Sequence, residues 1–586
     1  MEYGKLRGDG PLSYINKERM GWLLLAVCCL TVLPFLGMME FHTKGEPREA
    51  VVSLTMLKSG NWLLPTNNGG DIPYKPPMFH WLVAIFAWIC GGHVTEYISR
   101  LPSALALIGL TLVTYRYFAN RRGYVFAAAS ALVMFTCWEM HVAGGNARVD
   151  MLLTFFTVAA IFAITPRSIE RHRPAWGAIL LMSAAVLTKG PVGMVVPCMV
   201  CFLYYWMRGT TKFGWLLLTM FLNGVLALVI PFLWYWGGYM QRGQEFLDLV
   251  MEENFGRMTN TMSYDSCVHS WPYNFVLLLG GLVPWILLAL MLLFCVRIRG
   301  KRSAGMWKRA WRWLRRESNP ATALSIVGAL AIFIFYCIPQ SKRSVYLMPM
   351  YPFLAYLLTE FFAWGSRNHA KVVKAFGDIF AVAGVVLFAL FIALKAGMVP
   401  DSIMGHGKHA ADNVAILHSL RDCAGIGWLW AAVPVVLSAG WWWRLRRCSR
   451  GLGIIATEAL LVMGIYVAMS GTYQPAAVNA RSLKGTAAEM QRLFPDSPTT
   501  RIYEFISAGE FSKGDPVHFF ELDFYADDRI LNFRREKPTE GYLLISEKDA
   551  EEYMLGFERE GYSFTPAWEL PKKVFKQKTT LYRFRK

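Results

Sequence analysis

Charged residues are scarce in this sequence of 586 residues, since Asp, Glu, Lys and Arg together make up only 17% of it. A soluble protein of this length carries about a quarter of charged residues, so a soluble globular fold is excluded for most of the chain. Hydrophobic residues make up 55% and come in long blocks, such as residues 22–39 and 275–296. Because about 20 apolar residues cross the hydrocarbon core of a bilayer as a helix, the sequence predicts a polytopic α-helical membrane protein.

Other signals are missing too. No small-residue cleavage site follows the first hydrophobic block, so this block is expected to remain as an anchor. The sequence shows no internal repeat and no low-complexity tract. Most of the 11 cysteines lie within hydrophobic blocks, where cysteine acts as a small apolar residue. Cys267 and Cys423 fall in predicted external loops, and the sequence leaves open whether they pair.

The net charge of +19 at pH 7 would suit a protein that binds nucleic acid, but the distribution of the charge argues against this function. Residues 471–586 hold 18 Lys and Arg and 18 Asp and Glu, so the whole excess lies in residues 1–470. There the cations gather between hydrophobic blocks, above all in residues 297–316, which hold nine. This pattern is typical of cytoplasmic loops, so nucleic acid is not an expected partner.

The basic clusters also predict how the chain threads the membrane, because Lys and Arg are enriched in cytoplasmic loops. A path with all of them inside has thirteen crossings, an internal N-terminus and an external C-terminus. The predicted crossings are residues 21–39, 99–119, 124–141, 150–165, 175–189, 190–207, 213–236, 273–296, 321–338, 344–363, 375–397, 427–443 and 452–470. Residues 78–92 are not counted, since a crossing there would move the nine-cation loop outside. We expect this segment and residues 50–57 to form helices along the external membrane surface.

The last part of the chain has a different character. Strand-like alternation occurs at residues 500–506, 517–526, 541–546 and 580–586, and helical patterns occur at 482–493 and 547–556. We therefore predict a transmembrane domain at residues 1–470, with a first external loop at 40–98. A small extracytoplasmic α/β domain is predicted at residues 471–586.

Charged and aromatic residues at the predicted external ends of the helices indicate a polar cavity. Cations there run against the cytoplasmic bias of Lys and Arg, and ionisable residues near membrane spans often mark function. The residues concerned are Glu46, Arg48, Asp71, Tyr74, Lys75, His80, Arg148, Asp150, Lys189, Arg257, His269, Lys342, Arg343 and Tyr346. Taken singly, each has an ordinary explanation, such as a snorkelling lysine or an interfacial tyrosine. Their joint placement favours one site.

A cavity with two carboxylates and several cations suits an anionic substrate that is attached to a lipid. The cations would hold a phosphate and stabilise the negative charge that develops on it as it leaves. A carboxylate would accept the proton of an attacking hydroxyl group. A sugar linked to a lipid phosphate fits this division of roles, because a phosphate can leave without a general acid.

Several motifs, taken in order, resemble one bacterial family. They are the acidic first loop, GNWLLP, IPYKPP, ARVD, LTKGP, ENFGRM with a following histidine, and SKRSVYLMPMYP, all within residues 20–360. The combination is similar to the polyprenyl-phosphate-dependent glycosyltransferases related to lipid A aminoarabinose transferase and protein O-mannosyltransferases. The resemblance implies the GT-C fold, with about thirteen transmembrane helices, external juxtamembrane helices and the external C-terminal domain. It also implies a bacterial inner-membrane enzyme whose active site and C-terminal domain face the periplasm.

Together with the chemistry of the cavity, the resemblance gives roles to individual residues. The expected catalytic residues are Glu46, as the base, and Asp150, as the second acid. The residues expected to bind the donor phosphate are Arg48, Lys75, Lys189, Lys342 and Arg343. The residues expected to line the pocket or contact the acceptor are Tyr74, Arg148, Arg257, His269 and Tyr346.

Two departures from the family pattern concern the base and a metal. Gly45 precedes Glu46, where relatives often have a second acid, and Tyr74 stands before the KPP motif, where relatives often have an acid. The second departure weakens the case for a bound divalent metal. Only Asp71 and His80 remain nearby as candidate ligands, and the sequence requires no cofactor.

Two other classes of protein stay open at this point. A lipid or polysaccharide transporter or flippase would also have many spans, but its ionisable residues would lie midway through several crossings. A membrane scaffold would account for the external domain but not for acids and cations on one face. We expect a transferase that moves a sugar, with inversion, from a polyprenyl-phosphate donor to a lipid A, glycan or protein acceptor. The sequence identifies neither the sugar nor the acceptor.

Overall fold

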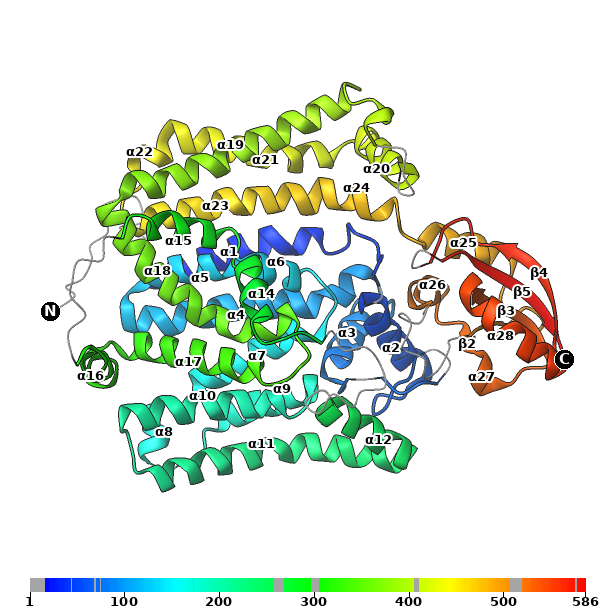
Figure 1. Cartoon of the computed structure of the whole chain (residues 1–586), viewed down its shortest axis with the longest axis horizontal. Helices are drawn as coiled ribbons and strands as arrows, with labels where there is room; N and C mark the ends of the chain where they lie inside the picture. The colour runs from blue at the N-terminus through cyan, green and yellow to red at the C-terminus, as the bar shows by residue number, and fades with distance from the viewer. Residues whose placement is uncertain are drawn as a thin grey trace.

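A computed structural model describes residues 16–43, 45–67, 70–73, 75–171, 173–256, 268–296, 305–404, 410–505, 519–574 and 577–586. The chain forms a long helical bundle with a small domain at one end (Figure 1). Within the described residues, eight helical stretches are long and apolar enough to cross a membrane. They are α1 (Lys17–Val32) with η2 (Leu33–Phe35), α4 (Glu96–Arg122), α11 (Phe213–Arg242), α17 (Pro320–Cys337), η5 (Ser344–Met350) with α18 (Tyr351–Asn368), α19 (Ala370–Lys395), α21 (Ile426–Gly440) with η7 (Trp441–Leu445) and α22 (Arg446–Cys448), and α23 (Leu452–Ala468) with η8 (Met469–Tyr473) and α24 (Gln474–Asn479).

Two pairs of bent helices raise the number of spans to as many as ten in this part of the chain. They are α5 (Tyr124–Phe135) with α6 (Trp138–Gly144), bent by 71°, and α14 (Tyr273–Gly281) with α15 (Trp285–Leu293), bent by 105°. The other three predicted crossings correspond to shorter apolar helices, α7 (Val149–Ala163), α9 (Trp176–Lys189) and α10 (Val192–Arg208). The multi-pass helical architecture is thus confirmed, and the number thirteen stays a prediction.

The two bends differ from the straight crossings expected at residues 124–141 and 273–296. Pro284 lies at the break before α15 and has no N–H group to continue the helical hydrogen bonds. At the other break, the N–H of Trp138 donates to the carbonyl of Val283 at 2.8 Å. An N–H group at one break is therefore paired with a carbonyl at the other. A hydrophobicity pattern does not reveal such a contact.

The two ends of the bundle carry different segments (Figure 1). One end holds α8 (Pro166–Glu170), α22 and α16 (Met306–Arg312), which continues into η4 (Trp313–Glu317). These belong to the basic connections predicted to be cytoplasmic. The opposite end holds α2 (Gly45–Ser59), α3 (Met78–Ile89), α12 (Gln244–Met251), the α20 helix (Ala410–Asp422) that follows η6 (Asp401–Met404), and the C-terminal domain. This separation agrees with the predicted threading.

Helix α2, expected at residues 50–57 to lie along the membrane surface, packs against other parts of the chain. Val51 and Met56 are fully buried, because α3 packs on one side of α2 and the C-terminal helix α26 (Phe520–Tyr525) covers another. The apolar face that suggested a surface helix is therefore covered by protein. Helix α3 keeps an exposed side with Trp88, as expected of a helix at a membrane interface.

The C-terminal domain contains a five-stranded mixed sheet in the order β2-β1-β3-β5-β4. Its elements are α25 (Lys484–Leu493), β1 (Ile502–Glu504), α26, β2 (Ile530–Asn532), α27 (Phe533–Glu536), β3 (Glu540–Ser546), α28 (Glu547–Arg559), β4 (Ser563–Glu569) and β5 (Thr579–Arg585). β2 and β3 run parallel to β1, with Ile502 paired to Ile530 and Tyr542, whereas β5 is antiparallel to β3 and β4. Two apolar clusters form the core of this domain.

The expected strand at residues 517–526 was wrong, because this part of the domain forms helix α26. Phe520, Leu522 and Phe524 are all buried, since α26 packs both within its own domain and on α2. A short helix buried on two sides produces the same alternation as a strand. The domain boundary also differs from the expected residue 471, because the last helical stretch continues to Asn479.

The stability of the C-terminal domain is expected to fall as the pH rises through neutrality. Burial raises the pKa of Glu504 on β1 from its ordinary value of 4.5 to about 8. Between these values the folded domain keeps a proton that the unfolded chain releases, so stability present at low pH is lost as the pH rises. Glu504→Gln fixes the neutral form and should flatten this dependence, measured by proteolysis of the domain in the full chain between about pH 5 and about pH 8. Glu569→Gln, on the exposed strand β4, is the control, and the same slope in both variants would contradict the prediction.

Candidate active site

Glu46 lies in the first turn of α2 and is only 3% exposed. Its oxygens accept hydrogen bonds from Arg100 on α4, from Nε at 2.8 Å and from Nη2 at 3.0 Å. The backbone N–H of Ala147 donates to Oε1 of the same carboxylate at 2.9 Å. A carboxylate oxygen offers about two lone-pair positions. Oε1 is therefore saturated, while Oε2 has capacity for another donor.

The ionised form of Glu46 is strongly favoured. Burial alone would raise its pKa, but the charge and hydrogen bonds of Arg100 and the N–H of Ala147 hold the pKa below its ordinary value. Arg100 is itself buried and fixed, because its Nη1 donates to the carbonyls of Leu36 at 2.7 Å and Met39 at 2.5 Å. The first-loop acid is therefore a fixed carboxylate at neutral pH.

A second carboxylate, Asp150, begins α7 and is surrounded by cations. It pairs with the ammonium of Lys189 at the end of α9, and Nε of Arg148 lies 3.9 Å from its Oδ2. The charge of Lys75 also acts on Asp150. Arg148 and Lys189 lie against this carboxylate, and Lys75 acts on it from its own pair with Glu253. Three cations therefore face two carboxylates, which leaves a local excess of positive charge for an anionic ligand.

Gly45 links the surroundings of the two carboxylates. A Cβ atom at this position would collide with Nη1 of Arg148, so glycine leaves room for the guanidinium beside the start of α2. Ala147, which binds Glu46, precedes Arg148, which faces Asp150. Relatives often have a second acid at the position of Gly45. In this chain, the guanidinium of Arg148 takes up the space beside that position.

Lys75 of the KPP motif pairs with Glu253 at 2.5 Å, and the two side chains are 14% and 6% exposed. Glu253 lies in η3 (Glu252–Gly256), which follows α12. Its neighbour Asn254 approaches Gly190 so closely that a Cβ at position 190 would collide with the amide. This contact brings η3 against the LTKGP turn, so Lys75 and Lys189 belong to one region.

Arg48 is held by the acidic residue Glu49, which is itself held by the basic residue His80. It pairs with Glu49 at 2.7 Å, and the other oxygen of Glu49 lies 2.9 Å from Nε2 of His80. Burial alone would raise the pKa of Glu49, but Arg48 and His80 hold it well below its ordinary value. His80 on α3 therefore holds Glu49 of α2, which in turn holds the guanidinium of Arg48.

The two candidate metal ligands do not form a site with other donors. His80 binds Glu49, whereas Asp71 pairs with Arg535 of the C-terminal domain at 3.4 Å. In the described part of the chain, no group of three or more His, Cys, Asp or Glu side chains could hold a metal ion. The residues present therefore do not fit the metal considered from the sequence.

The SKRSVY segment divides into residues with different roles. Lys342 is buried and donates to the carbonyls of Tyr336, Cys337 and Pro339 at the end of α17. Its ammonium satisfies carbonyls that the helix leaves free, and the expected contact of Lys342 with phosphate stays a prediction. Arg343, by contrast, has a buried Nε without a hydrogen-bond partner among the described atoms, which suits an anionic ligand.

Tyr346 joins the region through Lys189. The ammonium of Lys189 lies 4.5 Å from the centre of the Tyr346 ring, a favourable cation–π geometry. Tyr346 also stacks on Tyr336 at 5.7 Å. The aromatic pair therefore lies beside Lys189, and the pocket role of Tyr346 stays a prediction.

Of the remaining candidate residues, His269 is joined through its backbone to Gln340, which precedes the SKRSVY segment. His269 is exposed and stacks on Tyr273 at 4.1 Å, while its N–H donates to the carbonyl of Gln340 at 3.2 Å. Tyr74 and Arg257 lie outside the described residues, and so does Cys267.

The sequence interpretation missed Arg100 and did not choose Glu253 as a site residue. Arg100 fell inside the predicted crossing at 99–119, although an arginine at the external end of a span is itself an unusual signal. Glu139 on α6 was missed as well. Its side chain forms a hydrogen bond with Ser344 of the SKRSVY segment, and the negative charge of Asp150 acts on it. The sequence signal that could have identified Glu139 was an acidic residue beside a break in an apolar stretch.

Comparisons with known proteins show which sequences the chain is similar to. Residues 74–236 match the family described as dolichyl-phosphate-mannose-protein mannosyltransferase. An undecaprenyl phosphate-alpha-4-amino-4-deoxy-L-arabinose arabinosyl transferase from Erwinia tasmaniensis is 26% identical over 70% of this chain and 71% of its own length. The transferase of the same description from Shewanella sediminis is 27% identical over 61% of this chain and 64% of its own length.

The fold is also similar to that of a solved protein. The crystal structure of ArnT from Cupriavidus metallidurans bound to undecaprenyl phosphate superposes with a TM-score of 0.65, at 18% identity, over 96% of this chain and 98% of that protein. Its apo form gives the same TM-score. The similarity covers the helical bundle and the C-terminal domain together, so the expected GT-C architecture is confirmed.

Proposed function

We infer that this chain is a membrane glycosyltransferase, related to the polyprenyl-phosphate-dependent enzymes with the GT-C fold, that takes its sugar from a polyprenyl-phosphate carrier. The observation that carries this inference is the cluster of Lys75, Arg148 and Lys189 around Asp150, beside the buried carboxylate Glu46. Cations grouped around one acid suit the binding of a phosphate. The neighbouring carboxylate of Glu46 suits the removal of a proton from the acceptor. The named transferase relatives support this function and give no support to the transporter alternative.

The cations would hold the phosphate of the donor. Lys75 and Lys189 each pair with a carboxylate, and both pairs are partly open to solvent. A phosphate competes well for such lysines, because charge-assisted hydrogen bonds to phosphate are strong. Arg48, Arg148 and Arg343 would add contacts to the phosphate or to the sugar beside it. Lys342 would keep its structural role.

The transfer would be a single displacement. The acceptor oxygen attacks the anomeric carbon, the bond from this carbon to the phosphate oxygen breaks, and the bonding electrons leave on polyprenyl phosphate. Glu46 would take the proton of an acceptor hydroxyl through Oε2, and Asp150 would keep Lys189 in place for the leaving phosphate. One displacement inverts the configuration of the anomeric carbon. A phosphate acceptor on lipid A would already be ionised and would need no base.

The location of the reaction follows from the end of the bundle at which the site lies. Glu46 lies on α2, which is found with α3 and the C-terminal domain at the end of the bundle opposite the basic segments (Figure 1). We place this end on the periplasmic side of a bacterial inner membrane. An acceptor of the cell envelope, namely lipid A, a glycan or a protein, would be available there.

The proposed function can be tested with the purified chain in lipid nanodiscs. A panel of synthetic polyprenyl-phosphate sugars is offered with lipid A, a glycan or a peptide, and the release of polyprenyl phosphate is measured by mass spectrometry. We expect release from at least one donor that depends on the acceptor and yields an inverted glycoside. Release without an acceptor, or no release from any donor, would contradict a transferase function.

A further inference from the structure

Phe41 lies between the C-terminal domain and the arginine that holds Glu46. Its ring packs edge-on against Phe524 of α26 at 4.9 Å, and its N–H donates to the hydroxyl oxygen of Tyr525 at 2.8 Å. On the other side, the guanidinium carbon of Arg100 lies 5.2 Å from the centre of the Phe41 ring. One fully buried side chain thus connects α26 with Arg100.

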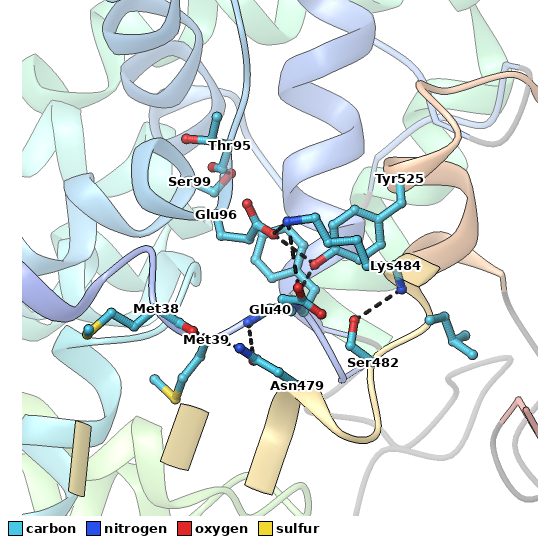
Figure 2. A network of polar contacts seen from close by, with 12 residues as sticks. Met38, Met39, Glu40, Thr95, Glu96, Ser99, Asn479, Ser482, Lys484 and Tyr525 are labelled. Carbon is cyan, nitrogen blue, oxygen red and sulfur yellow. Dashed lines mark hydrogen bonds and ion pairs between the residues drawn. The ribbon is translucent and has the colours of Figure 1, made fainter. Parts of the chain in front are cut away.

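The segment before Phe41, residues 38–40, is held by Asn479, which is also far away in the sequence. Asn479, at the end of α24, accepts a hydrogen bond from the N–H of Glu40 at 2.9 Å and donates to the carbonyl of Met38 at 3.0 Å. Figure 2 shows these contacts beside the first turn of α4. Met39, which lies between these two residues, supplies one of the carbonyls that fix Arg100. The segment has no regular helix or strand of its own, so its shape depends on these partners.

A third set of contacts closes the interface around Glu96. Tyr525 donates its hydroxyl hydrogen to Glu96 at 3.0 Å, and the ammonium of Lys484 on α25 lies 3.1 Å from the same carboxylate oxygen (Figure 2). Glu96 begins α4, one turn before Arg100. Both the helix that carries Arg100 and the segment that caps it are therefore fixed by the C-terminal domain.

We propose that Tyr525 and Phe524 are positioning residues for the transfer reaction, which act through Phe41 and Arg100 on the carboxylate of Glu46. The C-terminal domain is then part of the support of the active site. This inference rests on the proposed function for its effect on transfer. The mechanical connection from Tyr525 to Glu46 stands on the contacts alone and is measurable without activity.

The connection predicts a specific pattern of defects. The two lysines proposed to hold the donor phosphate, Lys75 and Lys189, pair with Glu253 on η3 and Asp150 on α7, and neither pair involves α2 or α26. Weakening the contact of α26 with Phe41 should therefore displace the carboxylate of Glu46 but leave donor binding unchanged. The turnover number kcat should fall, while the donor KM should stay the same. A variant that only destabilises the protein would lower the amount of active enzyme without loosening the folded site.

Tyr525→Phe is the direct test, because it removes the hydroxyl that joins Phe41 to Glu96 and keeps the ring. We expect kcat to fall about tenfold, the effect of a loss of about 1.4 kcal/mol, with the donor KM within about twofold of the wild type. The amide of Ala147, which donates to Glu46, should exchange its hydrogen several times faster, measured by mass spectrometry in nanodiscs. Phe41→Leu keeps the backbone bond to Tyr525 but removes the ring beside Arg100, and it should produce the same pattern if Tyr525→Phe folds poorly.

Tyr562→Phe is the matched control, since this tyrosine is buried in the same domain but packs against Phe533 and Phe584. It should leave kcat and the exchange of Ala147 unchanged. Wild-type kcat and wild-type exchange of Ala147 in Tyr525→Phe would overturn the proposal. If the wild type itself transfers no sugar, the proposed function fails, whereas the exchange of Ala147 still decides whether the C-terminal domain positions Glu46.

Discussion

Glu46→Gln is expected to lower the transfer rate to a hydroxyl acceptor by about 10² to 10⁴-fold, the usual contribution of a general base. The amide keeps the shape of the side chain and its contact with Ala147, but it does not accept the acceptor proton. Donor binding should persist, because the cations near Asp150 are untouched. The measurement is the initial rate of polyprenyl phosphate release at saturating donor and acceptor, beside donor affinity measured by a thermal shift.

The buried partner of Glu46 requires a control for stability. Neutralising the carboxylate leaves Arg100 as an unpaired buried cation, and such a change commonly costs about 3 to 5 kcal/mol. The double variant Glu46→Gln with Arg100→Met removes both charges and should recover stability while remaining inactive. A double variant that regains transfer, or a single variant within tenfold of the wild-type rate, would exclude Glu46 as the base.

The positions of several site residues were predictable from charge and topology. Lys75 precedes Pro76 and Lys189 precedes Gly190, while Asp150 lies at the start of an apolar segment. Cations are rare at external ends of spans, so their coincidence at one end of the bundle indicated a shared cavity. The structure brings these three residues together.

The partners of the site residues were not predictable in the same way. Lys342 and Arg343 are adjacent cations in one motif, and only the three-dimensional path of α17 decides that Lys342 binds its terminal carbonyls. Likewise, the pairing of Glu46 with Arg100 depends on how α2 packs on α4. Periodicity and charge bias describe single segments, whereas these contacts join segments that are far apart in the sequence.

The fold shows the same division. Long hydrophobic blocks identified most of the membrane helices, because length and apolarity are properties of one segment. The hydrogen bond that joins the breaks at Trp138 and Val283 and the burial of helix α26 on α2 are contacts between segments. The C-terminal domain was recognised from its change in composition, but its contact with Phe41 was not. That contact depends on side-chain packing across an interface between domains.

Lys75→Met is expected to reduce kcat/KM for the donor by about 10² to 10³-fold, the usual cost of losing one group that stabilises developing negative charge. Methionine keeps most of the length of the side chain but removes the ammonium. The loss should appear both as a higher donor KM and as a lower kcat, since the phosphate gains charge as it leaves. Lys75→Arg keeps the charge with a different shape and should give an intermediate rate.

Lys58→Met provides the comparison that assigns this loss to the site. Lys58 also lies in the first loop and also pairs with an acid, Asp527, at 2.6 Å, but these two side chains are 42% and 69% exposed. An exposed pair contributes about 0 to 1 kcal/mol, so Lys58→Met should keep kcat/KM within a few-fold of the wild type. Both rates are measured with the same donor and at the same salt concentration, because salt screens exposed charges more than buried ones. Equal effects of the two substitutions would mean that the KPP lysine acts through the general charge of the loop, and the phosphate would then have to bind elsewhere.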